Sequence, residues 1–213
     1  MAGKITALRV QKRNKNRVNV YVDGQFAFGL AAIEAAKLHR GQYLTDEDII
    51  RLREQDTRET AYEQALDFLS YRPRSEAEIR QYLHKKQVPP AIQEEVIARL
   101  KRVGLLDDYA FARYWVENRE QFKPRGRYAL RSELRQKGLS EEAIAAALEN
   151  LDEEESAYRA AQQRVRRWSH LEYQPFRQKL GAYLRRRGFA FETVEAVVTR
   201  VWNELHRESE HTT

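Results

Sequence analysis

The chain has 213 residues, 33% of them charged and 42% hydrophobic, and its 38 Lys and Arg against 32 Asp and Glu leave a formal net charge of +6. It contains no cysteine, which excludes disulfides, zinc ribbons and thiol catalysis. The sequence shows no signal peptide and no apolar run of membrane-spanning length, so we expect a cytoplasmic protein that does not bind membranes.

The first 30 residues predict a small basic β-sheet. Alternating segments at 5–10 and 17–22 predict strands, and Asp23-Gly24 predicts a two-residue hairpin turn that pairs Tyr21 with Phe26. This part of the chain holds six Lys or Arg against one Asp, so most of the net charge lies here. A sheet of this size is not stable alone and should pack on helices. Four of its cations are secondary candidates for binding an anionic partner: Lys12, Arg13, Lys15 and Arg17.

Helices are expected to follow the sheet. A short helix is predicted at 31–39, with Gly41 as its stop. Thr45 should cap a second helix, because three carboxylates follow in its first turn, where the helix dipole favours negative charge. We therefore assign residues 1–58 to an N-terminal extension made of a β-hairpin and helices, and from about residue 60 the chain should be helical throughout.

A repeat with a period of about 50 residues sets the predicted architecture. Gln87, Gly138 and Gly188 share one register, because each ends a basic helix that contains leucines and each is followed by an apolar residue. The pattern predicts a mainly α protein with three tandem three-helix repeats. The repeats are expected at 59–106, 107–151 and 152–208, with a tail at 209–213. One repeat can bury little core, so neighbours should stack into an elongated, curved array. The alternative is an ordinary helical bundle, because every amphipathic helix repeats its leucines.

Capping signals delimit the helices of the first repeat. Ser75 followed by Glu78 is a capping-box signal, so a helix should begin there. Pro89-Pro90 breaks that helix, and Gly104 should stop the next one. These signals predict where the middle and third helices of the repeat begin and end.

Charge is segregated by helix within each repeat. The predicted middle helices carry five basic residues against two acidic, six against one, and five against none, whereas the third helices are acidic. If stacking places equivalent helices side by side, the basic stripes merge into one anion-binding surface. The candidate residues are Arg72, Arg74, Arg80, Lys85, Lys86, Lys123, Arg125, Arg127, Arg131, Arg135, Lys137, Arg177, Lys179, Arg185, Arg186 and Arg187.

Helix electrostatics offers another explanation for part of this charge. Cations near helix C-termini complement the helix dipole and can simply solvate a face. This explanation does not cover cations before or at the start of a helix, where positive charge is unfavourable, namely Arg72, Arg74, Lys123, Arg125 and Arg127. These residues indicate an anionic partner, because arginine suits phosphate and carboxylate groups. We therefore expect charge reversal at Arg125, Arg127 and Arg131 together to weaken binding without unfolding the protein.

The sequence gives no support for catalysis. It has no phosphate-binding glycine loop, no HExxH and no Gly-x-Ser-x-Gly, and its five histidines lack ligand spacing. Asp107 and Asp108 are adjacent carboxylates, but neighbours in sequence point apart on a helix, and helix capping explains them. The acidic run at 152–155 is typical of the first turn of a helix. We predict a protein that is not an enzyme, with no metal and no cofactor.

Several motifs occur in a characteristic order. They are Tyr71-Arg72-Pro73-Arg74-Ser75, Gly104-Leu105-Leu106-Asp107-Asp108 with Phe111-Ala112, and Lys123-Pro124-Arg125-Gly126 with Leu130, Glu133-Leu134 and Lys137-Gly138. In this order they closely resemble the RecX family of bacterial recombination regulators. The resemblance covers about residues 60–202 and is weakest in the third repeat. The strand-rich N-terminus up to Gly29 is similar to an extension found on some members.

The resemblance implies a non-enzymatic modulator of RecA, the filament-forming ATPase that coats single-stranded DNA. RecX proteins are understood to lie in the helical groove of the RecA filament and to restrain ATP hydrolysis and strand exchange in recombinational repair and the SOS response. We expect a monomer that inhibits RecA and meets single- or double-stranded DNA directly or through RecA. The sequence itself does not distinguish inhibition from stimulation. Two alternatives stay open: a general DNA-binding protein that needs no protein partner, and an adaptor that recognises an acidic protein and ignores nucleic acid.

Overall fold

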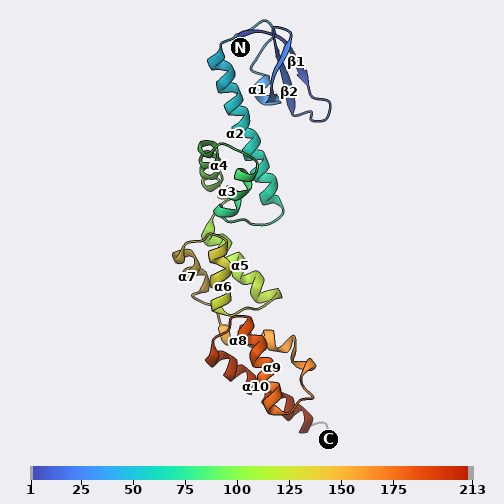
Figure 1. The fold of residues 1–213 in the computed structure, drawn as a ribbon, viewed down its shortest axis with the longest axis vertical. Coiled ribbons are helices and arrows are strands. Elements are labelled where there is room, and N and C mark those ends of the chain that lie inside the picture. The colour runs from blue at the N-terminus through green and yellow to red at the C-terminus, as the bar shows by residue number, and fades with distance from the viewer. Residues whose placement is uncertain (1, 211–213) are drawn as a thin grey trace. The chain divides into compact units, whose positions relative to one another are not determined.

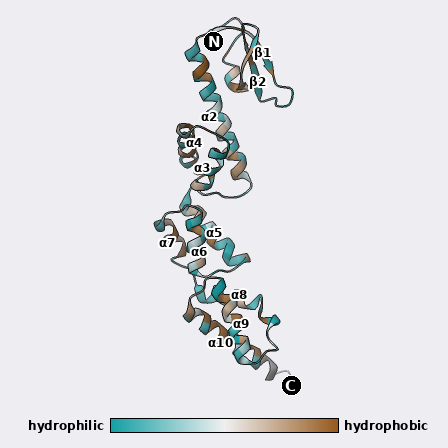
Figure 2. Cartoon of the chain, in the orientation of Figure 1, coloured by the Kyte–Doolittle hydropathy of each residue, from teal (hydrophilic) through white to brown (hydrophobic). Residues whose placement is uncertain are grey.

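A computed structural model describes residues 2–210 and divides the chain into two compact units (Figure 1). Unit 1 comprises Met1–Arg72 with Ile79–Leu106, and unit 2 comprises Pro73–Glu78 with Asp107–Thr213. The chain is mainly helical with a small N-terminal antiparallel sheet, as predicted. Hydrophobic and hydrophilic residues alternate along the helices of both units (Figure 2), as expected for helices that bury one face.

The sheet of unit 1 has four antiparallel strands in the order β3-β2-β1-β4. Their bounds are Gly3–Val10 for β1, Arg17–Val22 for β2, Gln25–Ala31 for β3 and Tyr43–Leu44 for β4. The predicted hairpin is confirmed, because Tyr21 lies opposite Phe26 and the turn residues Asp23 and Gly24 both have positive φ. The sequence did not reveal β4, since a strand of two residues is too short to show alternation.

Helix α1 (Ala32–Ala35) is much shorter than the helix expected at 31–39. The chain leaves the helix to pair with the sheet: the Gly41 N–H donates to the Ile5 carbonyl and the Ile5 N–H donates to the Gln42 carbonyl, both at 2.8 Å. Backbone pairing with β1 satisfies these polar groups just beyond residue 39, where the predicted helix was expected to end.

Helix α2 (Asp46–Ser70) begins at the predicted cap and runs without a break for 25 residues. The Thr45 hydroxyl accepts the Asp48 N–H and the Asp48 carboxylate accepts the Thr45 N–H, each at 3.1 Å. Figure 1 shows α2 running from the sheet to α3 and α4. The expected boundary between residues 58 and 59 therefore falls inside one continuous helix.

Asp56 joins α2 to the sheet. Its carboxylate pairs with the Arg17 guanidinium at 2.6 Å and accepts the Ala31 N–H at 2.9 Å. The Arg17 guanidinium also donates to the Thr60 hydroxyl at 2.8 Å. Arg17, a secondary candidate for anion binding, thus holds two elements of unit 1 together.

We expect Asp56→Ala to lower the free energy of unfolding by about 1–3 kcal/mol, because it leaves a half-buried guanidinium and an N–H without their acceptor. Urea unfolding followed by circular dichroism measures this loss, and hydrogen exchange should speed up in β3. Asp67→Ala is the matched control, since Asp67 is exposed on the same helix. Equal effects of the two substitutions would show that Asp56 does not anchor the sheet.

The first repeat consists of the second half of α2 with α3 (Glu76–Lys85) and α4 (Pro90–Arg102). The predicted capping box is confirmed: the Glu78 N–H donates to the Ser75 hydroxyl at 3.2 Å, and the Ser75 N–H donates to the Glu78 carboxylate at 3.4 Å. Gly104 follows α4 with φ of +71°. The core of this repeat is formed by Ala61, Ala65, Ile79, Leu83, Val88, Ile92, Val96, Ile97, Leu100 and Leu106.

Unit 2 contains the second and third repeats. Their helices are α5 (Asp108–Phe122), α6 (Arg127–Gln136), α7 (Glu141–Leu148), α8 (Glu153–Gln162), α9 (Tyr173–Arg186) and α10 (Phe191–Glu210), with a short 3₁₀ helix at Val165–Arg167. Asp107 caps α5 and Asp152 caps α8, which explains these carboxylates without catalysis or metal binding. The predicted tail at 209–213 begins inside α10, and residues 211–213 lie outside the described residues.

The three residues that share one register in the repeats lie at the ends of the middle helices, and their backbones adopt the left-handed conformation. The φ angles are +59° at Gln87, +78° at Gly138 and +81° at Gly188. In unit 2 the Gly126 N–H donates to the Arg187 carbonyl at 2.9 Å, so the end of α9 lies against the start of α6. These equivalent helices were expected side by side, but they meet end to start, because the close approach of two glycine backbones brings the helix ends together.

Candidate anion-binding surface

Unit 2 has a pocket of about 500 Å³ at the junction of its two repeats, here called the inter-repeat groove. It is lined from α6, from the start of α8 and from the end of α9 with the turn after it. The lining residues are Arg127, Tyr128, Arg131, Glu153, Arg185, Gly188, Phe189 and Ala190. Three predicted anion-binding residues from two repeats, Arg127, Arg131 and Arg185, therefore meet in one place.

Arg127 forms a wall of the groove and has structural partners. Its guanidinium donates to the Leu148 carbonyl at 2.5 Å and to the Leu151 carbonyl at 3.1 Å, which satisfies the C-terminal end of α7. Its backbone N–H donates to the Glu153 carboxylate at 2.8 Å. A cation at the start of α6 is thus explained by the neighbouring helix end, so its position alone does not indicate a partner.

Arg131 and Arg185 are the groove's available cations. Both side chains are exposed, and neither has an ion-pair partner within residues 2–210. Tyr128 beside them is 82% exposed. Two guanidinium groups next to an exposed aromatic ring can bind a phosphate or carboxylate and pack on an apolar surface at once.

Other predicted cations are paired inside each repeat. An arginine of the middle helix meets a glutamate of the third helix in all three repeats: Arg80 with Glu94, Arg135 with Glu141, and Arg177 with Glu195. The basic middle helices and acidic third helices that the sequence displays therefore hold each other in place. Exposed pairs of this kind contribute little stability each, about 0–1 kcal/mol. They nevertheless engage three arginines that the sequence analysis gave as candidates for binding an anionic partner.

A second group of predicted cations takes part in contacts inside unit 2, most of them between neighbouring repeats. Lys137 pairs with Glu78 at 2.6 Å, and Arg187 donates to the Pro124 carbonyl at 2.9 Å. Within the second repeat, Arg125 pairs with Glu133 at 2.9 Å. These contacts stabilise the packing of unit 2, and the partners of Lys137 and Arg187, which are 59 and 63 residues away in sequence, could not be deduced from spacing.

Glu133 is the centre of a network that the sequence did not reveal. Besides Arg125, its carboxylate accepts the Trp115 indole N–H at 2.7 Å and the Arg119 Nε–H at 2.8 Å. Lys137 lies 5.0 Å from the centroid of the same indole ring. Arg125, Lys137 and the Trp115 ring therefore serve the interior of the second repeat.

The rest of the predicted set lies outside the groove. Arg72 and Arg74 are half-buried, and the Lys86 ammonium lies 5.6 Å from the Tyr82 ring centroid. Several cations are exposed and have no ion-pair partner in the described part of the chain: Lys85, Lys123, Lys179 and Arg186, together with Lys12, Arg13 and Lys15 of the sheet.

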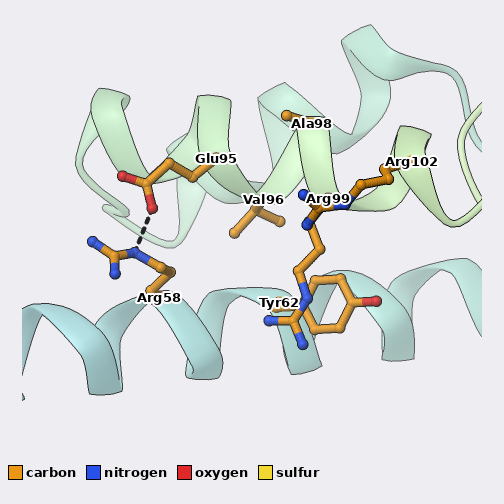
Figure 3. Close-up of a pocket in the computed structure, with 7 residues that line it drawn as sticks. All are labelled: Arg58, Tyr62, Glu95, Val96, Ala98, Arg99 and Arg102. Atoms are coloured by element: carbon orange, nitrogen blue, oxygen red, sulfur yellow. Dashed lines mark ion pairs between the residues drawn. The ribbon is translucent and has the colours of Figure 1, made fainter.

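A pocket of about 320 Å³ in unit 1 also carries arginines, but they are largely matched by carboxylates (Figure 3). Arg58 points toward Glu95 across the gap between α2 and α4. Arg99 pairs with Glu59 at 2.9 Å and lies 3.7 Å from the Tyr62 ring centroid. These contacts fasten α4 to α2, so we interpret this pocket as structural.

We expect Arg135→Gln to raise the pKa of Glu141 toward its ordinary value, because the Arg135 hydrogen bond holds that pKa below 4.5. Titration followed by carboxyl NMR measures the change. Glu142 is the internal control: its pKa is lowered chiefly by its own backbone N–H and by Ser140, and not by Arg135, so the pKa of Glu142 should move less than that of Glu141. A Glu141 pKa that stays low in the variant would contradict the pairing of Arg135.

Other functional classes find no support in the described residues. Within 2–210 no three His, Asp or Glu side chains gather to hold a metal ion. The helices of this part of the chain are all too short or too polar to cross a membrane. Asp108 is occupied by the Glu76 N–H at 2.9 Å, so the adjacent carboxylates at 107 and 108 both serve helix starts.

Comparison with known families accounts for the whole architecture. Four family models match in chain order: the regulatory protein RecX N-terminal domain at 3–45, and the first, second and third RecX three-helix domains at 61–100, 107–148 and 152–198. The third repeat, where the motif resemblance is weakest, is therefore matched as well.

Relatives and solved structures agree with these matches. Regulatory protein RecX of Bacillus subtilis (strain 168) is 32% identical over 211 residues, covering 97% of this chain and 80% of that protein, and its counterpart in Bacillus pumilus is 31% identical with the same coverage. A crystal structure of regulatory protein RecX is 30% identical, covers 92% of this chain and 98% of its own, and superposes with a TM-score of 0.70. RecX from Lactobacillus salivarius is 23% identical over 68% of this chain and 97% of its own, with a TM-score of 0.61, and shares the fold.

Proposed function

The chain belongs to the RecX family of regulatory proteins, and we propose that it binds the RecA filament on single-stranded DNA and inhibits RecA's ATP hydrolysis and strand exchange. Its matched relatives are named regulatory proteins, which supports a role without catalysis. The protein acts as a cytoplasmic monomer and reaches DNA directly or through RecA.

The inter-repeat groove is the observation that carries this proposal. A nucleoprotein filament presents phosphates and acidic side chains along a helical groove. Arg131 and Arg185 offer exposed guanidinium groups to such a surface, and Tyr128 offers exposed apolar area beside them. Charge-assisted hydrogen bonds from guanidinium to phosphate or carboxylate give both affinity and orientation.

Helical repeats also suit a repetitive target. Tandem repeats offer several contact surfaces to neighbouring RecA subunits, with the exposed cations Lys123, Lys179 and Arg186 adding to the groove. Several moderate contacts on one filament then act together, because each later contact forms at a high effective concentration. Bridging adjacent subunits would hinder the conformational change that accompanies ATP hydrolysis.

The direct test is RecA's single-stranded-DNA-dependent ATPase with this protein added at saturating concentration. We expect hydrolysis to fall by more than half. Unchanged hydrolysis would rule out the proposed inhibition. Electrophoretic mobility shifts with bare and with RecA-coated single-stranded DNA then separate the alternatives: a general DNA-binding protein binds both equally and with steep salt dependence, and an acidic-protein adaptor binds neither.

A further inference from the structure

The outer face of the N-terminal sheet has a composition unlike its inner face. Val18, Val20 and Val22 of β2 are buried in the core of unit 1, whereas the alternate positions Asn19 and Tyr21 point to the other face and are half-buried. Successive side chains of a strand alternate between faces. The outer face therefore carries aromatic, amide and basic groups, whereas the inner face is apolar.

Three side chains of this face contact one another in sequence, Arg9 with Tyr21 and Tyr21 with Phe26, and are here called the aromatic platform. The Arg9 guanidinium lies 5.0 Å from the Tyr21 ring centroid, and the Phe26 ring meets Tyr21 edge-on at 6.0 Å and 75°. Phe26 is 60% exposed, and Arg9 is also exposed. Exposed aromatic rings and arginine guanidinium planes are surfaces on which nucleobases stack, and here these surfaces are Phe26 and Arg9.

Charge around the platform favours a polyanion. The loop between β1 and β2 carries Lys12, Arg13 and Lys15, all exposed and without an ion-pair partner within residues 2–210. The single carboxylate among the first 30 residues, Asp23, already accepts the Lys4 N–H at 3.0 Å. Arg17 is excluded from this count because Asp56 of α2 occupies it.

We infer that the aromatic platform and the basic loop form a binding site for single-stranded DNA, with bases stacked on the Phe26 ring and on the Arg9 guanidinium that covers Tyr21, and with phosphates held by Lys12, Arg13 and Lys15. A duplex buries its base faces in its own stack, so stacking selects the single strand. This site is independent of RecA and of the inter-repeat groove.

The test is fluorescence anisotropy of a labelled deoxythymidine oligomer of about 15 nucleotides with the full chain and no RecA. Wild-type protein should bind it at least tenfold more tightly than a duplex of equal length, and no more weakly than the matching uridine oligomer. We expect Phe26→Ala to lower affinity by at least fivefold, as loss of one stacked base predicts. Tyr71→Ala, which removes a ring that is 83% exposed elsewhere in unit 1, should leave affinity unchanged.

Replacing Lys12, Arg13 and Lys15 together with alanine should lower the slope of log affinity against log salt by about 2, because each phosphate contact on a single strand contributes about 0.7. Equal affinity for duplex, tighter binding of the uridine oligomer, or a Phe26→Ala protein that binds like the wild type would each overturn the proposal. Because RecA is absent, failure here leaves the ATPase test of the proposed function unaffected.

Discussion

Gly188→Ala is expected to lower the free energy of unfolding by about 2–5 kcal/mol. Holding a residue with a Cβ in the left-handed conformation costs about 1–2 kcal/mol, and the clash adds about 1–3 kcal/mol. A Cβ at Gly188 would lie 2.6 Å from the Ala129 backbone nitrogen and 2.5 Å from its Cβ. Backbone atoms cannot move aside as a flexible side chain does, so the end of α9 and the start of α6 must separate.

Urea unfolding measures the loss, and tryptophan fluorescence follows unit 2 specifically, since Trp115, Trp168 and Trp202 all lie there. Gly104→Ala is the matched control, because Gly104 also has positive φ but a Cβ there would meet nothing within 4 Å. It should cost only the conformational part, about 1–2 kcal/mol, as measured by circular dichroism. Equal losses in the two variants would contradict the contact between the repeats.

A double-mutant comparison separates methyl from backbone clashes. At Gly138 a Cβ would meet the Ala77 Cβ at 2.4 Å, and the next atom is 3.9 Å away. Ala77→Gly should therefore restore much of the stability lost in Gly138→Ala. Ala129→Gly should not restore Gly188→Ala, because the Ala129 backbone nitrogen stays in place. The coupling energies of the two cycles measure this difference.

Charge reversal in the inter-repeat groove should have the largest effect on function. We expect Arg131→Glu with Arg185→Glu to weaken inhibition of the RecA ATPase by at least tenfold, because each lost charge-assisted contact contributes about 1.5–3 kcal/mol. Both side chains are exposed and without ion-pair partners in the described chain, so the circular dichroism spectrum and the unfolding midpoint should not change.

Arg166→Glu with Arg167→Glu is the control for this prediction. These residues are exposed in the same unit and the substitutions change the net charge equally. An equal loss in the control would mean that RecA responds to total charge. Wild-type inhibition by the groove variant would mean that the groove is not the contact surface.

Local signals in the sequence predicted local structure well. The hairpin at Asp23-Gly24 and the caps at Thr45, Ser75 and Asp107 lie where expected, because each depends on residues within a few positions of one another. The sequence also indicates that α2 is continuous, since neither Gly nor Pro occurs between 46 and 70. Assigning residues 1–58 to a separate N-terminal extension nevertheless placed a boundary inside this helix.

The roles of the cations depended on distant partners and were less predictable. Sequence position singled out Arg127 as a cation in an unfavourable place, yet its guanidinium satisfies carbonyls of residues 148 and 151. Arg125 likewise serves Glu133. Charge reversal at Arg125, Arg127 and Arg131 together would therefore remove contacts that stabilise unit 2 as well as charge on a binding surface. Charge reversal at Arg131 and Arg185 tests the binding surface alone.

The glycine contacts also give the series of repeats a direction. Within unit 2 the first turns of α3 and α6 each receive the terminal glycine of the next middle helix in the chain, Gly138 at Ala77 and Gly188 at Ala129. Gln87, at the corresponding place of the first repeat, is exposed and carries a full side chain. A duplicated repeat could therefore be added after the third one with its own glycine, whereas one inserted ahead of the first would collide with Gln87. Gene duplication could thus extend the series of repeats after the third repeat more readily than before the first.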